Sequence, residues 1–155
     1  MPGFNLQKGT VRDTGALVVD MEVFGLVGEL EVRKALRLQY PVAIVVVKPG
    51  LSPEEDGARL LERLARLISP LLRQTDLLAV SASPPVVYVL LIDVLAGDLE
   101  IVMTRISDEV DRHQLAGSPD SARLQINLGG GCFPSTATTW RDLVSLSERG
   151  TTAPA

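Results

Sequence analysis

The chain has 155 residues, 46% of them hydrophobic and 22% charged, which is enough for one globular domain with a buried core. Its net charge of −4 argues against a nucleic-acid polymer as the main partner, because neutralising phosphates requires clustered Lys and Arg. The single Cys and the single His exclude an internal disulfide and offer no metal-ligand cluster, and we expect no cofactor.

The sequence also lacks the signals of membrane insertion and export. No apolar run approaches the roughly 20 residues of a transmembrane helix, and the N-terminus lacks the basic start and apolar core of a signal peptide. We therefore expect a cytoplasmic location. We expect a lead-in over residues 1–19, one domain over residues 20–149 and a disordered tail over residues 150–155, and the Met1 start favours a complete small protein.

The first third of the chain predicts a helix followed by a strand. Before them, the apolar residues 16–19 are compatible with a short strand or with the start of a helix. From Gly28 the apolar residues recur at helical spacing, which predicts an amphipathic helix that ends near Tyr40. The continuous apolar run 42–47 predicts a buried central strand, ended by the Lys-Pro-Gly segment 48–50.

A second helix is predicted to begin at Ser52, with Pro53 at its first position and Glu55 at the capping-box position. It should run to about Ile68 or Leu72.

Two apolar runs follow, residues 77–80 and 86–92, joined by a short connection of small residues and prolines. This pattern predicts a β-hairpin. Because both runs are too apolar for exposed strands, the hairpin should lie in the middle of the sheet with helices over it.

The last third of the chain predicts a long helix, a strand and a final helix. The long helix begins at Gly97 and ends in a loop near residues 117–120. Residues 123–128 alternate polar and apolar, which favours a half-buried strand near a sheet edge. The triple glycine 129–131 is interpreted as a bulge or turn that ends this strand, because no helix and no Lys-Ser/Thr pair follows it as in a phosphate loop. The final helix runs from Thr139 to about residue 147.

This order of elements predicts an α/β fold, a ferredoxin-like mixed sheet with a central antiparallel hairpin flanked by helices. We expect structural roles for three further residues. Cys132 should pack, His113 should lie at the surface, and Trp140 should belong to the core or anchor an interface.

Four short motifs share their order and spacing with one known family: Val23-Phe24-Gly25-Leu26, Gly57-Ala58-Arg59-Leu60-Leu61, Arg73-Gln74-Thr75-Asp76-Leu77 and Leu124-Gln125-Ile126-Asn127-Leu128-Gly129. They resemble the Leu-Thr-Gly-Leu, Gly-Asp-x-x-Leu, Arg-x-x-Asp-Leu and Val-Thr-x-Ser-x-Gly motifs of GGDEF domains. The GGDEF domain is the palm-like fold of bacterial diguanylate cyclases, and the resemblance covers roughly residues 20–149.

The departures from this family fall on the residues that carry its chemistry. The segment 82–86, Ala-Ser-Pro-Pro-Val, stands where the family has its Gly-Gly-Asp/Glu-Glu-Phe signature, and Lys48 or a neighbour stands in place of a metal-binding Asp. The stretch between Lys48 and Gly57 is too short for the substrate-binding loop, and the closing segment of the family is missing. The resemblance therefore implies a degenerate GGDEF domain that is not an enzyme, because phosphoryl transfer depends on metal and charge neutralisation.

On this basis, the chain is expected to be a protein-interaction or regulatory module in bacterial signalling or cell organisation, with a protein partner or a second copy of itself. One alternative is a cyclic di-GMP receptor. The resemblance implies that Arg73 and Asp76 would bind the dinucleotide, with Arg105 as a further candidate. The structural alternative for these residues is an Arg at a helix end and an Asp at a turn into a strand. A third interpretation is an unrelated ferredoxin-like domain that binds another small molecule.

Overall fold

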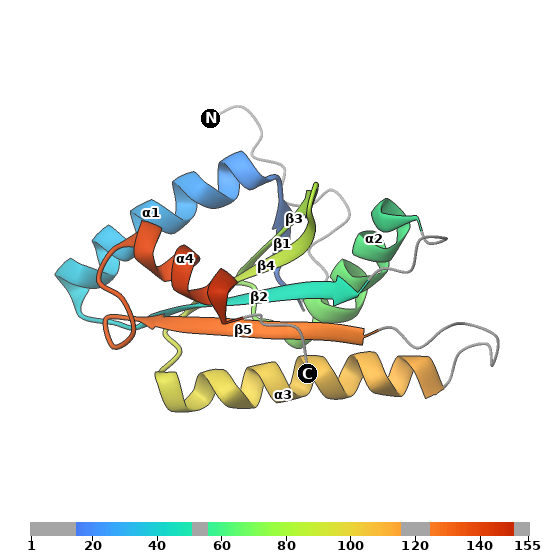
Figure 1. Ribbon diagram of the computed structural model, residues 1–155. Helices are drawn as coiled ribbons and strands as arrows, with labels where there is room; N and C mark the ends of the chain where they lie inside the picture. The colour runs from blue at the N-terminus through green and yellow to red at the C-terminus, as the bar shows by residue number, and fades with distance from the viewer. Residues whose placement is uncertain (1–14, 51–55, 116–124, 151–155) are drawn as a thin grey trace, which may run out of the picture.

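The computed structural model describes residues 15–50, 56–115 and 125–150, and Figure 1 shows them as a sheet with helices on both faces. The elements in chain order are β1 (Leu17–Val19), α1 (Met21–Leu38), β2 (Val42–Gly50), α2 (Gly57–Ile68), the 3-10 helix η1 (Ser69–Leu71), β3 (Leu77–Ala82), β4 (Pro85–Ile92), α3 (Ala96–Leu115), β5 (Gln125–Phe133) and α4 (Trp140–Arg149). None of the helices in these described ranges is long and apolar enough to cross a membrane.

Within the described ranges the sheet has five strands in the order β1-β3-β4-β2-β5. The neighbours β3 and β4, β4 and β2, and β2 and β5 are antiparallel, whereas β1 is parallel to β3. The predicted mixed sheet and its antiparallel hairpin are therefore confirmed, with β3 and β4 inside the sheet. The open question about residues 16–19 is also answered, because Leu17–Val19 form a strand at one edge.

Strand β2 divides the core into two layers. Its residues from Val42 to Val47 are 0% exposed, as the prediction of a buried central strand requires. Alternate side chains point to opposite faces. The face with Val45 packs against α2 and α3, and the face with Ile44 packs against α1 and α4. In Figure 1, α1 and α4 lie above the sheet and α3 lies below it.

Two helices begin elsewhere than the sequence suggested. Helix α1 starts at Met21 rather than near Gly28, because the Asp20 side chain accepts a hydrogen bond of 2.8 Å from the backbone N–H of Val23 and caps the helix. Helix α2 starts at Gly57, and its N-cap is Asp56. The predicted start at residues 52–55 lies outside the described residues.

The triple glycine does not end a strand, which corrects the sequence interpretation. Residues 129–131 lie inside β5, paired with the middle of β2. A Cβ at Gly130 would lie 3.1 Å from the Met103 side chain of α3, and one at Gly131 would lie 3.1 Å from the Ser147 hydroxyl of α4. The glycines therefore let two helices approach opposite faces of one strand.

Strand β2 is also longer than predicted, since it continues through Lys48 and Pro49 to Gly50, where β5 is its only partner among the described strands. A proline is tolerated at that position because only one side of the strand needs a ladder hydrogen bond. The predicted edge strand, the helix from Gly97 and the last helix, with Thr139 as its N-cap, are confirmed within a few residues. The predicted loop at 117–120 lies outside the described residues, as does the tail beyond Gly150.

Candidate functional site

The tip of the β3–β4 hairpin carries the segment 82–86, which the sequence resemblance aligns with the GGDEF signature. The two strands pair up to Ala82 and Pro85, so Ser83 and Pro84 form the turn between them. Ala82, Ser83 and Pro84 are exposed. This tip presents one hydroxyl and no carboxylate, and its prolines have no backbone N–H to donate to a phosphate.

Lys48, which with its neighbours is the sequence's candidate for the position of the family's metal-binding Asp, lies near the end of β2. Its side chain is partly buried, and Nζ donates a hydrogen bond of 3.2 Å to the backbone carbonyl of Glu148 in the last turn of α4. A cation at this end of a helix interacts favourably with the helix dipole. Lys48 therefore fastens the end of α4 to the sheet.

Tyr88 on β4 contacts the same turn of α4. Its hydroxyl donates a hydrogen bond of 3.3 Å to Oε1 of Glu148. Burial raises the pKa of Tyr88 to about 12, and the nearby Glu148 carboxylate adds to the effect. The phenol consequently keeps its proton at neutral pH and acts as a hydrogen-bond donor.

Asp76 lies in the turn that leads from η1 into β3. Its side chain is buried, with only 2% of the residue exposed. Oδ2 accepts a hydrogen bond of 2.8 Å from the backbone N–H of Arg73, and Oδ1 accepts one of 3.0 Å from the backbone N–H of Ile92 at the end of β4. Asp76 thus ties the entrance of the hairpin to its exit.

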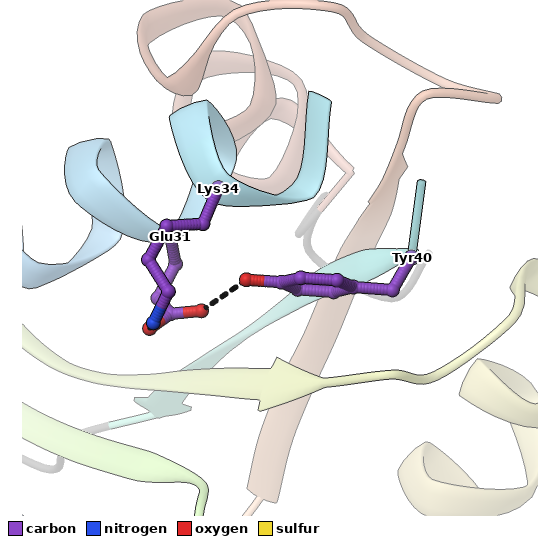
Figure 2. Close-up of polar contacts among 3 residues, drawn as sticks. All are labelled: Glu31, Lys34 and Tyr40. Atoms are coloured by element: carbon purple, nitrogen blue, oxygen red, sulfur yellow. Dashed lines mark hydrogen bonds and ion pairs between the residues drawn. The ribbon is translucent and has the colours of Figure 1, made fainter. Parts of the chain in front are cut away.

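A third polar cluster joins the last turns of α1 to the start of β2. Figure 2 shows the Tyr40 hydroxyl pointing at the Glu31 carboxylate, to which it donates a hydrogen bond of 2.8 Å. Lys34 forms an ion pair of 2.8 Å with the other oxygen of Glu31. Burial and the Glu31 carboxylate raise the pKa of Tyr40 to about 12. This cluster closes the connection between the helix and the strand.

The other residues that the sequence singled out are Cys132, His113 and Trp140. Cys132 is buried, as predicted, and burial raises the pKa of its thiol, so it is a poor nucleophile. His113 is exposed, also as predicted. Trp140 packs at 5.6 Å between ring centroids against Phe24 of α1. Across the described ranges, no three His, Cys, Asp or Glu residues come together in a group that could hold a metal ion.

Neither a protein-family model nor a curated protein matches the sequence. Solved structures do match the fold of this chain. A DGC protein from Thermotoga maritima has a TM-score of 0.73 at 15% identity, covering 87% of this chain and 96% of that chain. The GGDEF domain of FimX from Pseudomonas aeruginosa has a TM-score of 0.73 at 16% identity, covering 86% of each chain.

A third match is the diguanylate cyclase SiaD from Pseudomonas aeruginosa in complex with its activator SiaC. It has a TM-score of 0.72 at 15% identity and covers 85% of this chain and 53% of that chain. The chain has the fold of a GGDEF domain. At these identities the likeness concerns the arrangement of elements, so the chemistry must be judged from this chain's own residues.

The GGDEF fold of this chain spreads the three predicted ligand residues over two places. Arg73 and Asp76 lie between η1 and β3, whereas Arg105 lies on α3. Both arginines are exposed, and Asp76 is buried. No hydrogen bond or ion pair joins these three side chains to one another within the described part of the chain. The geometry of Asp76 is that of the structural alternative, an Asp at a turn into a strand.

The sequence interpretation missed the contacts around Glu148. The partners Tyr88 and Lys48 are 60 and 100 residues away in the chain, so no local motif contains the group. Only the three-dimensional structure brings these three residues together. A local signal did exist for α1, because Asp20 is a good N-cap residue directly before the apolar residues of that helix.

Proposed function

We propose that this chain is a degenerate, catalytically inactive member of the GGDEF family that acts as a protein-interaction or regulatory module in bacterial signalling or cell organisation. The observation that carries the proposal is the hairpin tip, where Ser83 and Pro84 form the turn in a fold matched by diguanylate cyclases. A tip without carboxylates cannot neutralise the charge of a phosphoryl group through a bound metal.

The lysine at the end of β2 supports the same conclusion. Lys48 or a neighbour stands where the family resemblance places a metal-binding Asp, and the ammonium group of Lys48 already bonds the carbonyl of Glu148. A cation there repels a divalent metal ion instead of binding it. The fold is retained while two of its chemical positions hold residues of the wrong kind, which favours selection for a surface rather than for a reaction.

A role in binding another protein has a parallel among the matching structures. SiaD was solved in complex with its activator SiaC, so a domain of this fold occurs in a protein that forms a protein complex. For the present chain, we infer that the partner is a protein or a second copy.

The test is incubation of the purified full chain with GTP and either Mg²⁺ or Mn²⁺, followed by chromatography for a cyclic dinucleotide. An active diguanylate cyclase under the same conditions is the control. We expect no product above the no-protein blank. Formation of a cyclic dinucleotide in proportion to protein concentration would refute the proposal.

The cyclic di-GMP receptor remains the second candidate, because the Arg73 guanidinium is exposed and forms no ion pair with any described residue. Asp76 weakens this candidate, since both of its carboxylate oxygens already accept backbone N–H groups. Calorimetry with cyclic di-GMP decides between the two. We expect no heat of binding at tens of micromolar. Binding that is lost in Arg73→Ala and kept in Arg63→Ala, another exposed arginine, would establish the receptor instead.

A further inference from the structure

Helix α1 exposes a line of apolar side chains on its outer face. Val23, Leu26 and Leu30 are 39%, 69% and 54% exposed, although the opposite side of the same helix buries Phe24 and Ala35 in the core. The spacing of three and four residues places the three side chains in one stripe. Because the opposite side of α1 packs in the core, this stripe faces away from the sheet. Helix α1 itself lies along the upper border of the molecule in Figure 1.

The outermost charges of α1 have opposite signs at its two ends. Asp20 and Glu22 lie at the N-terminal end, and Arg33, Lys34 and Arg37 lie in the last two turns. Glu29 and Glu31 lie between these groups and form ion pairs with Arg33 and Lys34. In the described part of the chain, neither Glu22 nor Arg37 forms an ion pair. The pair between Arg33 and Glu29 is 3.4 Å long and mostly exposed, so it holds Arg33 only weakly.

We propose that α1 is a homodimerisation helix, on which two copies of the chain pack antiparallel through Val23, Leu26 and Leu30. This inference rests on the proposed function and names its partner as a second copy. The argument for a second copy is charge complementarity. Antiparallel packing brings the acidic end of each α1 opposite the basic end of the other, whereas parallel packing sets like charges side by side.

The register follows from the positions of the leucines. A two-fold axis midway between Leu26 and Leu30 passes near residue 28 and sets Leu26 of each copy against Leu30 of the other. Glu22 lies six residues before that midpoint, and Arg33 and Arg37 lie five and nine residues after it. Because each residue advances an α-helix by about 1.5 Å, the carboxylate of one copy comes within side-chain reach of both guanidinium groups of the other.

The length of α1 limits how strongly two copies can associate through it. Helix α1 has 18 residues and is therefore roughly 27 Å long. One helix pair of that length buries less area than a standard stable interface, so the dimer should dissociate on dilution in the micromolar range. Sedimentation equilibrium of the full chain between about 1 and 200 µM covers this range.

The apolar part of the interface is tested with Leu26→Glu and Leu30→Glu, both at exposed positions that should leave the fold intact. Each should weaken self-association roughly tenfold or more. The matched control is Leu36→Glu. Leu36 lies on the same helix and is 71% exposed, but it is rotated by roughly 120° from Leu30 about the axis, so its variant should dimerise like the parent.

The charged part of the interface is tested with two charge-reversal variants, measured first separately and then as an equimolar mixture. Glu22→Arg sets arginines against arginines, and the double variant Arg33→Glu with Arg37→Glu sets acids against acids, so each alone should be monomeric. An equimolar mixture should restore the dimer, because every contact then joins opposite charges. Circular dichroism of each variant confirms that the helix content is unchanged.

A chain that stays monomeric at 200 µM, or a dimer that Leu26→Glu and Leu36→Glu weaken equally, would overturn the inference, as would a mixture that remains monomeric. A monomeric chain that makes no cyclic dinucleotide would leave the proposed function standing. A chain that makes the dinucleotide would remove the proposed function whatever its oligomeric state, so the two failures are distinguishable.

Discussion

Gly28 shows how a single missing side chain positions the only tryptophan of the chain. It is buried on the inner face of α1, and a Cβ added there would overlap the six-membered ring of Trp140. The indole in turn packs against Phe24, whose ring lies 5.9 Å from that of Tyr88 on β4. The absence of a side chain at Gly28 therefore allows α4 to begin beside α1.

This close contact gives opposite predictions for two glycines of one helix. Gly28→Ala should lower the free energy of unfolding by roughly 1–3 kcal/mol, because overpacking exceeds the gain of about 1 kcal/mol in helix propensity. Gly25→Ala is the matched control. A Cβ at Gly25 has no atom within 4 Å, so this variant should be stabilised by up to ~1 kcal/mol. Urea denaturation of both variants checks the signs, and a stabilised Gly28→Ala would contradict the packing described.

Asp76 supports a second prediction at the residue scale. Asp76→Ala removes the acceptor for the N–H groups of Arg73 and Ile92 and leaves them without their partner at the base of the hairpin. The loss should be roughly 2–4 kcal/mol, which lowers the melting temperature by roughly 5–15 °C. Asp108→Ala, at an exposed position of α3, should change it little. Equal melting temperatures for the two variants would mean that the carboxylate has no structural role.

At the scale of elements, two phenols join helices to strands. Tyr40, two residues before β2, bonds Glu31 of α1, and Tyr88 of β4 bonds Glu148 of α4. These are the only tyrosines in the chain, and both pKa values are raised to about 12. The folded state therefore holds two protons that the unfolded state releases near pH 10.

The sign of the pH dependence follows from this difference. The stabilisation that the two phenols provide is fully present below about pH 10 and is lost as the pH rises through about 12, because deprotonation then favours the unfolded chain. An ultraviolet titration of tyrosinate should show a midpoint near 12 in the native protein and near 10 in denaturant. Tyr88→Phe should halve the native signal without moving its midpoint. A native midpoint near 10 would show that the hydroxyls are hydrated.

Elements were predictable from sequence where one local pattern acted alone. The hairpin was found because two apolar runs flank a connection rich in proline, and the final helix because Thr139 is a good N-cap. The prediction for Gly130 was wrong because a glycine is needed there for a tertiary contact: it makes room for α3 against the sheet. The same limit applies to the candidate site, since the residue type of Lys48 could be read directly whereas its bond to α4 could not.

At the scale of the whole molecule, the sheet determines which segments can open independently. Strand β2 pairs with β4 on one side and β5 on the other, and helices cover both of its faces. Among the described residues, strand β1 instead pairs with β3 alone over three residues, and its Leu17 and Val18 are 64% and 50% exposed. The order of strands thus places the least exposed backbone between the hairpin and β5.

Native-state hydrogen exchange followed by NMR should reproduce this order. Amides of β2 between Val42 and Val47 should exchange only through global unfolding, because both edges of the strand are paired and no apolar residue there is exposed. Amides of β1 should exchange faster by about two orders of magnitude or more, through local opening that leaves the rest of the sheet intact. In the variant Leu26→Glu, whose self-association is weakened, this ranking should persist, because it depends on the sheet and not on the dimer. If β1 were as protected as β2 in that variant, the edge strand would have to be held by contacts other than its pairing with β3, and the sheet would open as one cooperative unit.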